Sequence, residues 1–159
     1  MKTRGGFTYI EAMVAVAVVA LFFGALYALN AQCLNVLNSA RQTAAAGQSL
    51  QDRIEQFRSC TWDQVTDATY IQNSILNAAT TSGYNIAGSI ETVTLSAYPI
   101  ATTPTQVVRA NGTASTTSTN SNLVNGDIVR IDVSLTWVAG LGARARSQSV
   151  SSIIAKNVP

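Results

Sequence analysis

The sequence contains no histidine among its 159 residues. Histidine is the side chain most often used as a general base near neutral pH, and it is also the commonest metal ligand. The remaining serine, cysteine, lysine and carboxylate side chains show no spacing that is typical of a catalytic or metal site. We therefore expect that the protein is not an enzyme, has no catalytic residue and holds no metal or other cofactor.

Charged residues are scarce, at 11% of the chain, against about 25% in an average soluble domain. Hydrophobic residues make up 47%, which favours a membrane segment joined to a polar, weakly charged domain. Two of the ten basic side chains, Lys2 and Arg4, lie in the first four residues, and without them eight basic side chains face eight acidic ones. The basic footprint of a nucleic-acid-binding domain is missing, so nucleic acid is not an expected partner.

Cysteine is also scarce, with two residues in the chain. Cys33 and Cys60 would lie about 40 Å apart on one continuous helix, whereas a disulfide needs Cα atoms within roughly 7 Å of each other. We expect no bridge between them within the chain. Two free thiols and an intermolecular bridge are both compatible with the sequence.

An uncharged apolar run extends from Ala12 to Leu29, and its roughly 18 residues are just enough to span a bilayer core. The residues from Phe7 to Ile10 lengthen it, with Glu11 as the one interruption. A secretory signal peptide would have a shorter apolar core followed by a small-residue cleavage site. A plain signal anchor would explain the basic start and the apolar run, but neither the glycine pair at 5 and 6 nor the carboxylate.

Glu11 is costly in this position. An acidic residue at the centre of a membrane helix costs roughly 2.5–3.5 kcal/mol on insertion scales, so it requires a partner or a function. If the chain were cut between Gly6 and Phe7, the new α-amino group of Phe7 would supply a cation. That cation could pair with Glu11 of a neighbouring subunit.

The residues from Gly5 to Glu11 read Gly-Gly-Phe-Thr-Tyr-Ile-Glu, which resembles the processing motif of type IV prepilins. Tyr9 stands where leucine is common in that motif. The resemblance implies that a membrane prepilin peptidase cuts after Gly6 and N-methylates Phe7. It also implies that Glu11 guides docking of the subunit into a growing filament.

The resemblance further implies that residues 1–6 form a leader and residues 7–29 a transmembrane helix that later becomes the filament core. Lys2 and Arg4 would orient the chain with the leader in the cytoplasm, since positive residues favour the inner side. The expected location is the bacterial inner membrane, crossed once, with the rest of the chain outside the cytoplasm, and later the filament.

The same helix is predicted to continue through residues 30–60. This stretch has no proline and one glycine, and it is rich in alanine, glutamine, leucine and arginine. Leu50, Ile54 and Phe57 follow the i, i+4, i+7 spacing of a helix face packed on a core. We expect this amphipathic half to carry a head domain made of residues 61–159.

The head is predicted to contain short elements of both kinds. We expect a helix exit and turn at Thr61–Gln64, then a short helix from Ala68 to Ala79 with Asp67 as its cap. Further along we expect a strand over Ile90–Tyr98, a short strand over Gln106–Arg109 and an exposed Ser/Thr/Asn-rich loop over Asn111–Asn122.

The clearest strand pattern covers Ile128–Val138, where apolar and polar residues alternate as in a half-buried antiparallel strand. A turn at Ala139–Gly142 and a partner strand over Ala143–Ala155 complete a predicted hairpin. This hairpin resembles that of V-type minor pilins and I-type minor pseudopilins. The predicted fold class is therefore α+β and type IV pilin-like: a long N-terminal helix, membrane-spanning in its first half, packed on a small antiparallel sheet.

The function expected from these resemblances is that of a minor type IV pilus subunit that is processed, then assembled into or priming the filament. Its partners would be the prepilin peptidase, other pilin or pseudopilin subunits and the inner-membrane assembly platform. A minor pseudopilin of a type II secretion system is the first alternative. The second is a tip-located binding module, an adhesin or a DNA-uptake subunit, with Arg109, Arg144, Arg146 and Lys156 as a small basic surface.

Overall fold

A computed structural model describes residues 8–77, 86, 88–97, 103–120, 123–139 and 144–156. The chain divides into two compact units, Met1–Ser39 and Ala40–Pro159. The predicted leader and residues 140–142 of the predicted turn lie outside the described residues, while Ala139, the first residue of that turn in our prediction, belongs to a strand. Within them, the secondary structure consists of one long helix, several short helices and five strands, which is an α+β fold.

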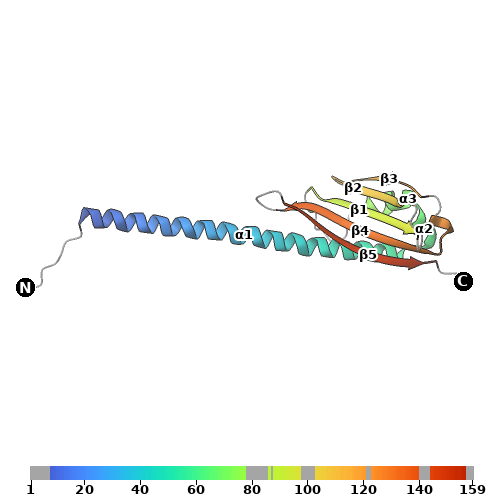
Figure 1. Ribbon diagram of the computed structural model, residues 1–159, viewed down its shortest axis with the longest axis horizontal. Coiled ribbons are helices and arrows are strands. Elements are labelled where there is room, and N and C mark those ends of the chain that lie inside the picture. Colours follow the sequence, from blue (N-terminus) through green and yellow to red (C-terminus); the bar gives the residue numbers. More distant parts are fainter. Residues whose placement is uncertain are drawn as a thin grey trace, which may run out of the picture. The chain divides into compact units, whose positions relative to one another are not determined.

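The long helix α1 covers Tyr9–Ser59, 51 residues without a break (Figure 1). The predicted continuous helix is therefore confirmed over these residues. The part of α1 that lies in the first unit, Tyr9–Ser39, carries one charge, Glu11, and a long uncharged apolar run. Such a run forms a helix readily because each backbone hydrogen bond is made within the segment itself.

In the second unit, α1 lays one face against a sheet. The buried helix residues recur three or four positions apart, as a helix face packed on a core requires. They are Ala45, Ala46, Leu50, Arg53, Ile54 and Phe57. The predicted stripe of Leu50, Ile54 and Phe57 is thus confirmed, and Arg53 is an unexpected member of it.

Five strands form one antiparallel sheet in the order β3-β2-β1-β4-β5. They are β1 (Ile90–Ala97), β2 (Thr105–Ala110), β3 (Thr113–Ser118), β4 (Ile128–Ala139) and β5 (Arg144–Ala155). The longest pairing joins β4 to β5 from Ile128↔Ala155 to Ala139↔Arg144, which confirms the predicted C-terminal hairpin strands.

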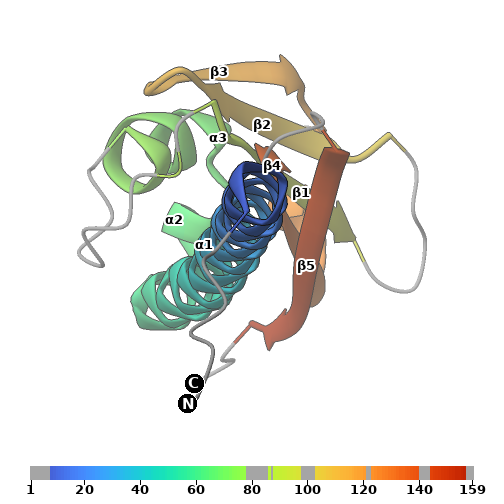
Figure 2. The same ribbon diagram turned by 90° about the vertical axis from the view of Figure 1, so that its left-hand side faces the viewer.

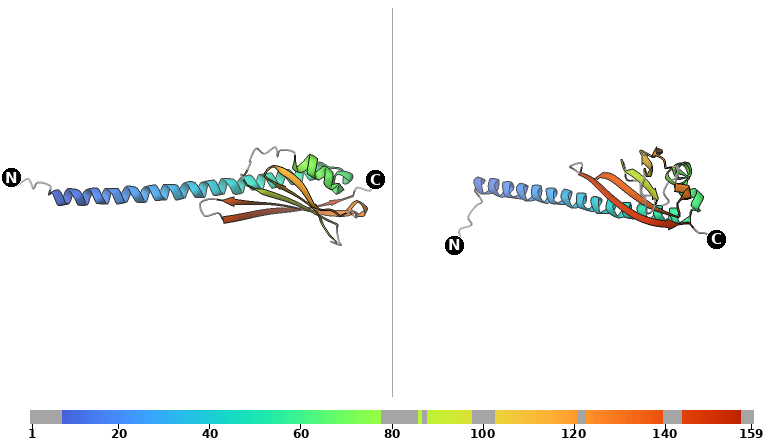
Figure 3. Two further views of the ribbon diagram at one scale, coloured as in Figure 1. Left: turned by 90° about the horizontal axis from the view of Figure 1, so that it is seen from above. Right: turned by 45° about the vertical axis from the view of Figure 1, so that its right-hand side comes forward.

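Residues 40–59 of α1 and the short helices cover the same face of this sheet, so the second unit has two layers (Figures 2 and 3). Every second residue of β4 from Val129 to Trp137 is apolar and faces the core, as the sequence predicts. Val129, Ile131, Val133, Leu135 and Trp137 are all buried. Together with the buried helix face they form a single core.

The predicted exit from the long helix is confirmed, since α1 ends at Ser59, but the predicted turn at Thr61–Gln64 is wrong, because the short helix α2 (Trp62–Thr66) begins there. The backbone N–H of Thr61 donates to Gln64 Oε1 at 2.9 Å, which satisfies a donor at the start of α2. Burial of Val65 against the core gives this short segment its reason to stay helical.

The predicted cap at Asp67 is confirmed, because its side chain accepts a hydrogen bond from the backbone N–H of Thr69 at 2.8 Å. The helix that follows is not uniform. The segment α3 (Ala68–Tyr70) is α-helical, and η1 (Ile71–Leu76) is a π-helix whose last turn is closed by a bond from the Asn77 N–H to the Gln72 carbonyl.

The predicted loop at Asn111–Asn122 is also wrong, since β3 occupies Thr113–Ser118 and pairs with β2. The connecting residues Asn111 and Gly112 both have positive φ, 51° and 82°. Asn-Gly is the pair preferred in two-residue hairpin turns, because both positions must adopt positive φ. The turn chemistry therefore outweighs the loop-like composition of the strand.

Candidate functional site

Glu11, the predicted assembly residue, lies in the first turn of α1 and is among the described residues. The backbone N–H of Glu11 donates to Thr8 Oγ1 at 3.4 Å. Thr8 directly precedes the helix, and its hydroxyl accepts from one of the orphan N–H donors of the first turn, as an N-cap side chain does. Glu11 also lies where the positive end of the helix dipole favours a carboxylate.

The carboxylate of Glu11 is solvent-exposed. Among the described residues, no hydrogen bond or ion pair of its side chain is present. The predicted cleavage pair Gly6 and Phe7 and the predicted orienting residues Lys2 and Arg4 lie outside the described residues. Their roles stay predictions.

The surface of α1 beyond Glu11 is apolar and uncovered. Within the described residues, α1 is the one helix that is long and apolar enough to cross a membrane, and its most apolar 18-residue window is entirely exposed. The core helix of a soluble domain would instead have buried most of such a window.

Two tyrosines lie near the ends of this apolar surface. Tyr9 is 79% exposed and Tyr27 is 80% exposed. Their 18-residue separation corresponds to about 27 Å along a helix, close to the roughly 30 Å of a bilayer core. Tyrosine is enriched at both membrane–water interfaces, so these two residues fit the positions of interfacial anchors. Glu11 would then lie just inside one interface.

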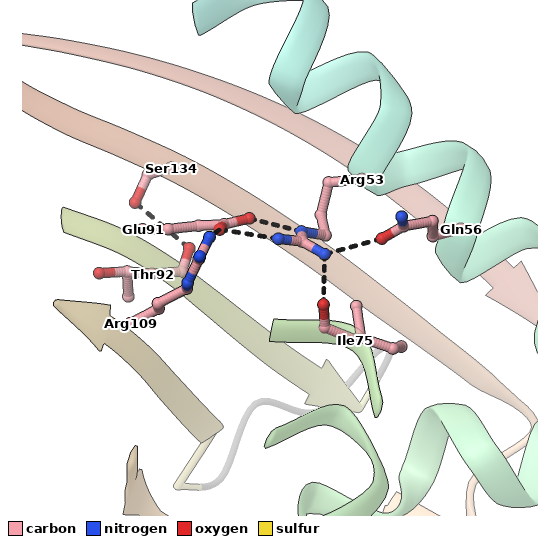
Figure 4. A network of polar contacts seen from close by, with 7 residues as sticks. All are labelled: Arg53, Gln56, Ile75, Glu91, Thr92, Arg109 and Ser134. Carbon is pink, nitrogen blue, oxygen red and sulfur yellow. Dashed lines mark hydrogen bonds and ion pairs between the residues drawn. The ribbon is translucent and has the colours of Figure 1, made fainter. Parts of the chain in front are cut away.

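A second charged group lies deep in the second unit. The Arg53 guanidinium is fully buried, and it makes a two-pronged contact with the Glu91 carboxylate (Figure 4). Nε lies 2.6 Å from Oε1 and Nη2 lies 3.0 Å from Oε2. This bidentate geometry is the strongest form of arginine–carboxylate pairing.

The third nitrogen of the Arg53 guanidinium also has partners. This nitrogen, Nη1, donates to Gln56 Oε1 at 2.7 Å and to the Ile75 carbonyl. Ile75 belongs to the last turn of η1, where carbonyl groups have no partner within the helix and a cation is favoured. Arg53 of α1 thereby links β1 and η1 through one side chain.

Sequence reasoning missed Arg53 and Glu91, although both carry a readable signal. Arg53 falls between Leu50, Ile54 and Phe57 on the apolar face of the helix. Glu91 is in phase with the inward-facing residues of β1. A charge placed on each of two apolar faces indicates that the two faces meet with the charges paired.

The predicted basic surface is divided by the structure. Arg109 Nη1 lies 3.8 Å from Glu91 Oε2, and the Arg109 side chain is 25% exposed, so this residue belongs to the edge of the buried network. Arg144, Arg146 and Lys156 are exposed on β5 and just after it.

Both cysteines are free thiols. Cys33 is exposed on α1, and Cys60 is half-buried just after α1. Burial raises the pKa of the Cys60 thiol. Its sulfur also contacts the Gln56 carbonyl at 3.2 Å. Across the described residues there is no group of three or more Cys, Asp or Glu side chains that could hold a metal ion.

These features define an α+β protein with an uncovered apolar N-terminal helix, a lone carboxylate in the first turn of that helix and a polar, well-packed head. No protein-family model, curated protein or solved structure gives a significant match to this chain.

Proposed function

We propose that the protein is a minor subunit of a type IV pilus that is cut by a prepilin peptidase and assembled into, or primes, the filament. The observation that carries the proposal is Glu11, a carboxylate without a partner among the described residues at the start of a membrane-length apolar helix. The stretch Gly5–Glu11, which ends at this carboxylate, resembles the prepilin processing motif.

The proposed chemistry is one peptide cut and one charge pair. Cutting between Gly6 and Phe7 removes Lys2 and Arg4 and gives Phe7 an α-amino group, which the peptidase then methylates. In the assembled filament this amine from one subunit neutralises Glu11 of a neighbour. The pair offsets the cost of holding the carboxylate among apolar helices.

The proposed location is the bacterial inner membrane, with α1 crossing once and the head outside the cytoplasm, followed by the filament. The partners are the peptidase, other pilin subunits and the inner-membrane assembly platform. The resemblance of the C-terminal hairpin to both V-type minor pilins and I-type pseudopilins leaves a type II secretion pseudopilus as the alternative filament.

The test is to express the full chain with a prepilin peptidase and a set of filament subunits. Mass spectrometry of the mature chain should find Phe7 at its N-terminus with one added methyl group. Glu11→Ala should be inserted into the membrane normally but should be strongly depleted from sheared filaments, because its carboxylate is needed to pair with the neighbouring amine.

Glu55→Ala is the matched control, since Glu55 is an exposed glutamate of the same helix whose carboxylate accepts from Arg58 at 2.8 Å. It should enter filaments at the wild-type level. Equal incorporation of Glu11→Ala and the wild type would exclude the proposed pairing. If the chain entered only the pseudopilus of a type II secretion system, and if its loss stopped secretion through that system, the filament would be the alternative pseudopilus.

A further inference from the structure

Strand β5 lies at an edge of the described sheet. It is 12 residues long and pairs with β4 along one side, and no described strand pairs with its other side. An open edge presents unpaired backbone N–H and C=O groups, to which another chain can add a strand. Such an edge is an interaction surface if specific side chains flank it.

The register shows which residues offer their backbone to the open side. The N–H of Lys156 donates to the Asp127 carbonyl at 2.7 Å, directly beyond the Ile128↔Ala155 pair. Opposite residues in an antiparallel ladder alternate between bonded and non-bonded pairs. Counting back from Lys156, the non-bonded positions include Ser151 and Ile153. Their N–H and C=O groups therefore point away from β4.

A shallow hollow lies against this same part of the edge. It is lined by Arg58, Arg130, Ser151, Ser152 and Ile153. Arg130 stands opposite Ile153 on β4, while Arg58 comes from the last turn of α1. The two guanidinium groups flank the edge from the sheet side and the helix side, and both side chains are more than half exposed, at 53% and 57%.

The charged side chains of β5 itself, and of Lys156 directly after it, all have one sign, although Glu55 and Asp132 lie beside the two arginines. The stretch from Arg144 to Lys156 contains three basic residues and no acidic one. The opposite edge of the sheet, β3, carries no charge at all. Charge complementarity therefore indicates an acidic partner at β5, and β3 of a second copy would not supply it.

We propose that the β5 edge binds an extended acidic segment of a partner protein by adding it as a further strand. Successive side chains of a strand point to opposite faces. Two adjacent carboxylates in the added strand would therefore reach Arg130 on one face and Arg58 on the other. The backbone of Ser151 and Ile153 would supply the hydrogen bonds between the strands. This binding is independent of the role of Glu11.

Each arginine already has a carboxylate neighbour within the chain. Arg58 Nη1 lies 2.8 Å from Glu55 Oε1, and Arg130 Nη2 lies 2.8 Å from Asp132 Oδ1, which also accepts from the Ser151 hydroxyl. An incoming carboxylate would compete with these neighbours. Replacing Asp132 with asparagine should consequently strengthen binding of an acidic strand, because it removes this competing carboxylate.

The probe is a fluorescein-labelled peptide of alternating threonine and valine with a central Asp-Glu pair, titrated against the full chain in detergent micelles. Fluorescence anisotropy should report saturable binding at low salt that weakens as salt screens the exposed charges. A peptide with Asn-Gln in place of Asp-Glu should bind about tenfold more weakly, as expected for the loss of two exposed ion pairs.

The variant Arg58→Gln/Arg130→Gln should show the same loss of about tenfold, and Asp132→Asn should bind the acidic peptide more tightly than the wild type. Arg144→Gln is the matched control, because it removes an exposed cation from the other end of β5. It should bind nearly as the wild type does. Ile153→Pro should weaken binding of both peptides, since it removes a backbone donor from the open side.

Four outcomes would overturn the proposal. The first is equal binding of the acidic and amide peptides, and the second is no binding of the acidic peptide at low salt. The third is self-association of Arg58→Gln/Arg130→Gln, which would mean that the cations protect the edge from other chains. The fourth is displacement of the peptide by duplex DNA, which would make a phosphate backbone the ligand. Intrinsic tryptophan fluorescence checks that each variant is folded.

Discussion

The two stretches of α1 differ in where their apolar side chains lie, although the backbone is one continuous helix. In Tyr9–Ser39 the large apolar residues are exposed, and Leu21 is 75% accessible. In Ala40–Ser59 the apolar face is buried in the core, and Leu50 is 3% accessible. Helix formation does not distinguish the two stretches; the surroundings of their side chains do.

The charges on the two stretches are handled in opposite ways. The second contains Arg53, whose three guanidinium nitrogens all have partners, in Glu91, Gln56 and the Ile75 carbonyl. The first contains Glu11, whose carboxylate has no partner among the described residues. A charge that the fold satisfies contributes to holding the head together. An exposed charge in water needs no partner, whereas a carboxylate carried into a bilayer or an apolar helix bundle does, and the proposed assembly role of Glu11 depends on that condition.

The same substitution in the two regions should have very different effects on the head. Glu91→Gln leaves the buried Arg53 cation without its carboxylate, and it should lower the free energy of unfolding by about 3–5 kcal/mol. Glu11→Gln should leave that free energy unchanged. Urea unfolding of the full chain in detergent, followed by tryptophan fluorescence, measures this, because Trp62 and Trp137 both lie in the second unit.

A double variant separates the charge effect from simple loss of packing. Arg53→Met/Glu91→Leu removes both charges and should recover much of the lost stability, since a buried ion pair is often replaceable by apolar groups of similar size. If Glu91→Gln unfolded at the wild-type urea concentration, Arg53 would have another adequate partner, and the contrast with Glu11 would disappear.

Leu→Ala at matched positions tests the packing contrast. Leu50→Ala should destabilise the head by about 2–5 kcal/mol, because it removes buried methyl groups and leaves a cavity. Leu21→Ala should change the same unfolding transition by less than about 0.5 kcal/mol, as an exposed substitution does. A comparable loss for Leu21→Ala would mean that its side chain also supports the head.

The elements with a strong local period were predictable from the sequence. The uncharged run and the absence of proline indicate a long helix, and α1 has that form. The two-residue alternation of Val129, Ile131 and Val133 indicates a half-buried strand, and these residues are buried on β4. In both cases the local pattern and the tertiary packing require the same structure, so a local reading suffices.

Features set by contacts between distant residues could not be predicted in the same way. The pairing of Arg53 with Glu91 joins residues 38 positions apart, so neither charge alone identifies its partner. The β2–β3 hairpin was readable from Asn111-Gly112, but the hydroxyl-rich composition of β3 indicates a loop when it is considered alone. The π-helical turn of η1 has no sequence signature, and the Ile75 carbonyl in its last turn accepts a hydrogen bond from the distant Arg53.

The smallest expected difference is in the chemical reactivity of the two cysteines, the exposed Cys33 of the first stretch and the half-buried Cys60 directly after the second. Burial raises the pKa of the Cys60 thiol, so at a given pH near neutral a smaller fraction is thiolate. The thiolate is the nucleophile, and access also limits the reaction, so iodoacetamide should modify Cys60 several-fold more slowly than the exposed Cys33. Peptide mass spectrometry of the full chain in detergent, sampled over time, gives both rates from one reaction.

The pH dependence separates the two causes. If desolvation of the thiolate slows Cys60, its rate should continue to rise at pH values where an ordinary thiol has reached its plateau, because the raised pKa moves the titration upward. If access alone slows it, the Cys60 rate should stay a constant fraction of the Cys33 rate at every pH. Labelling in urea should make the two rates equal, because unfolding exposes Cys60 to the same solvent that already surrounds Cys33.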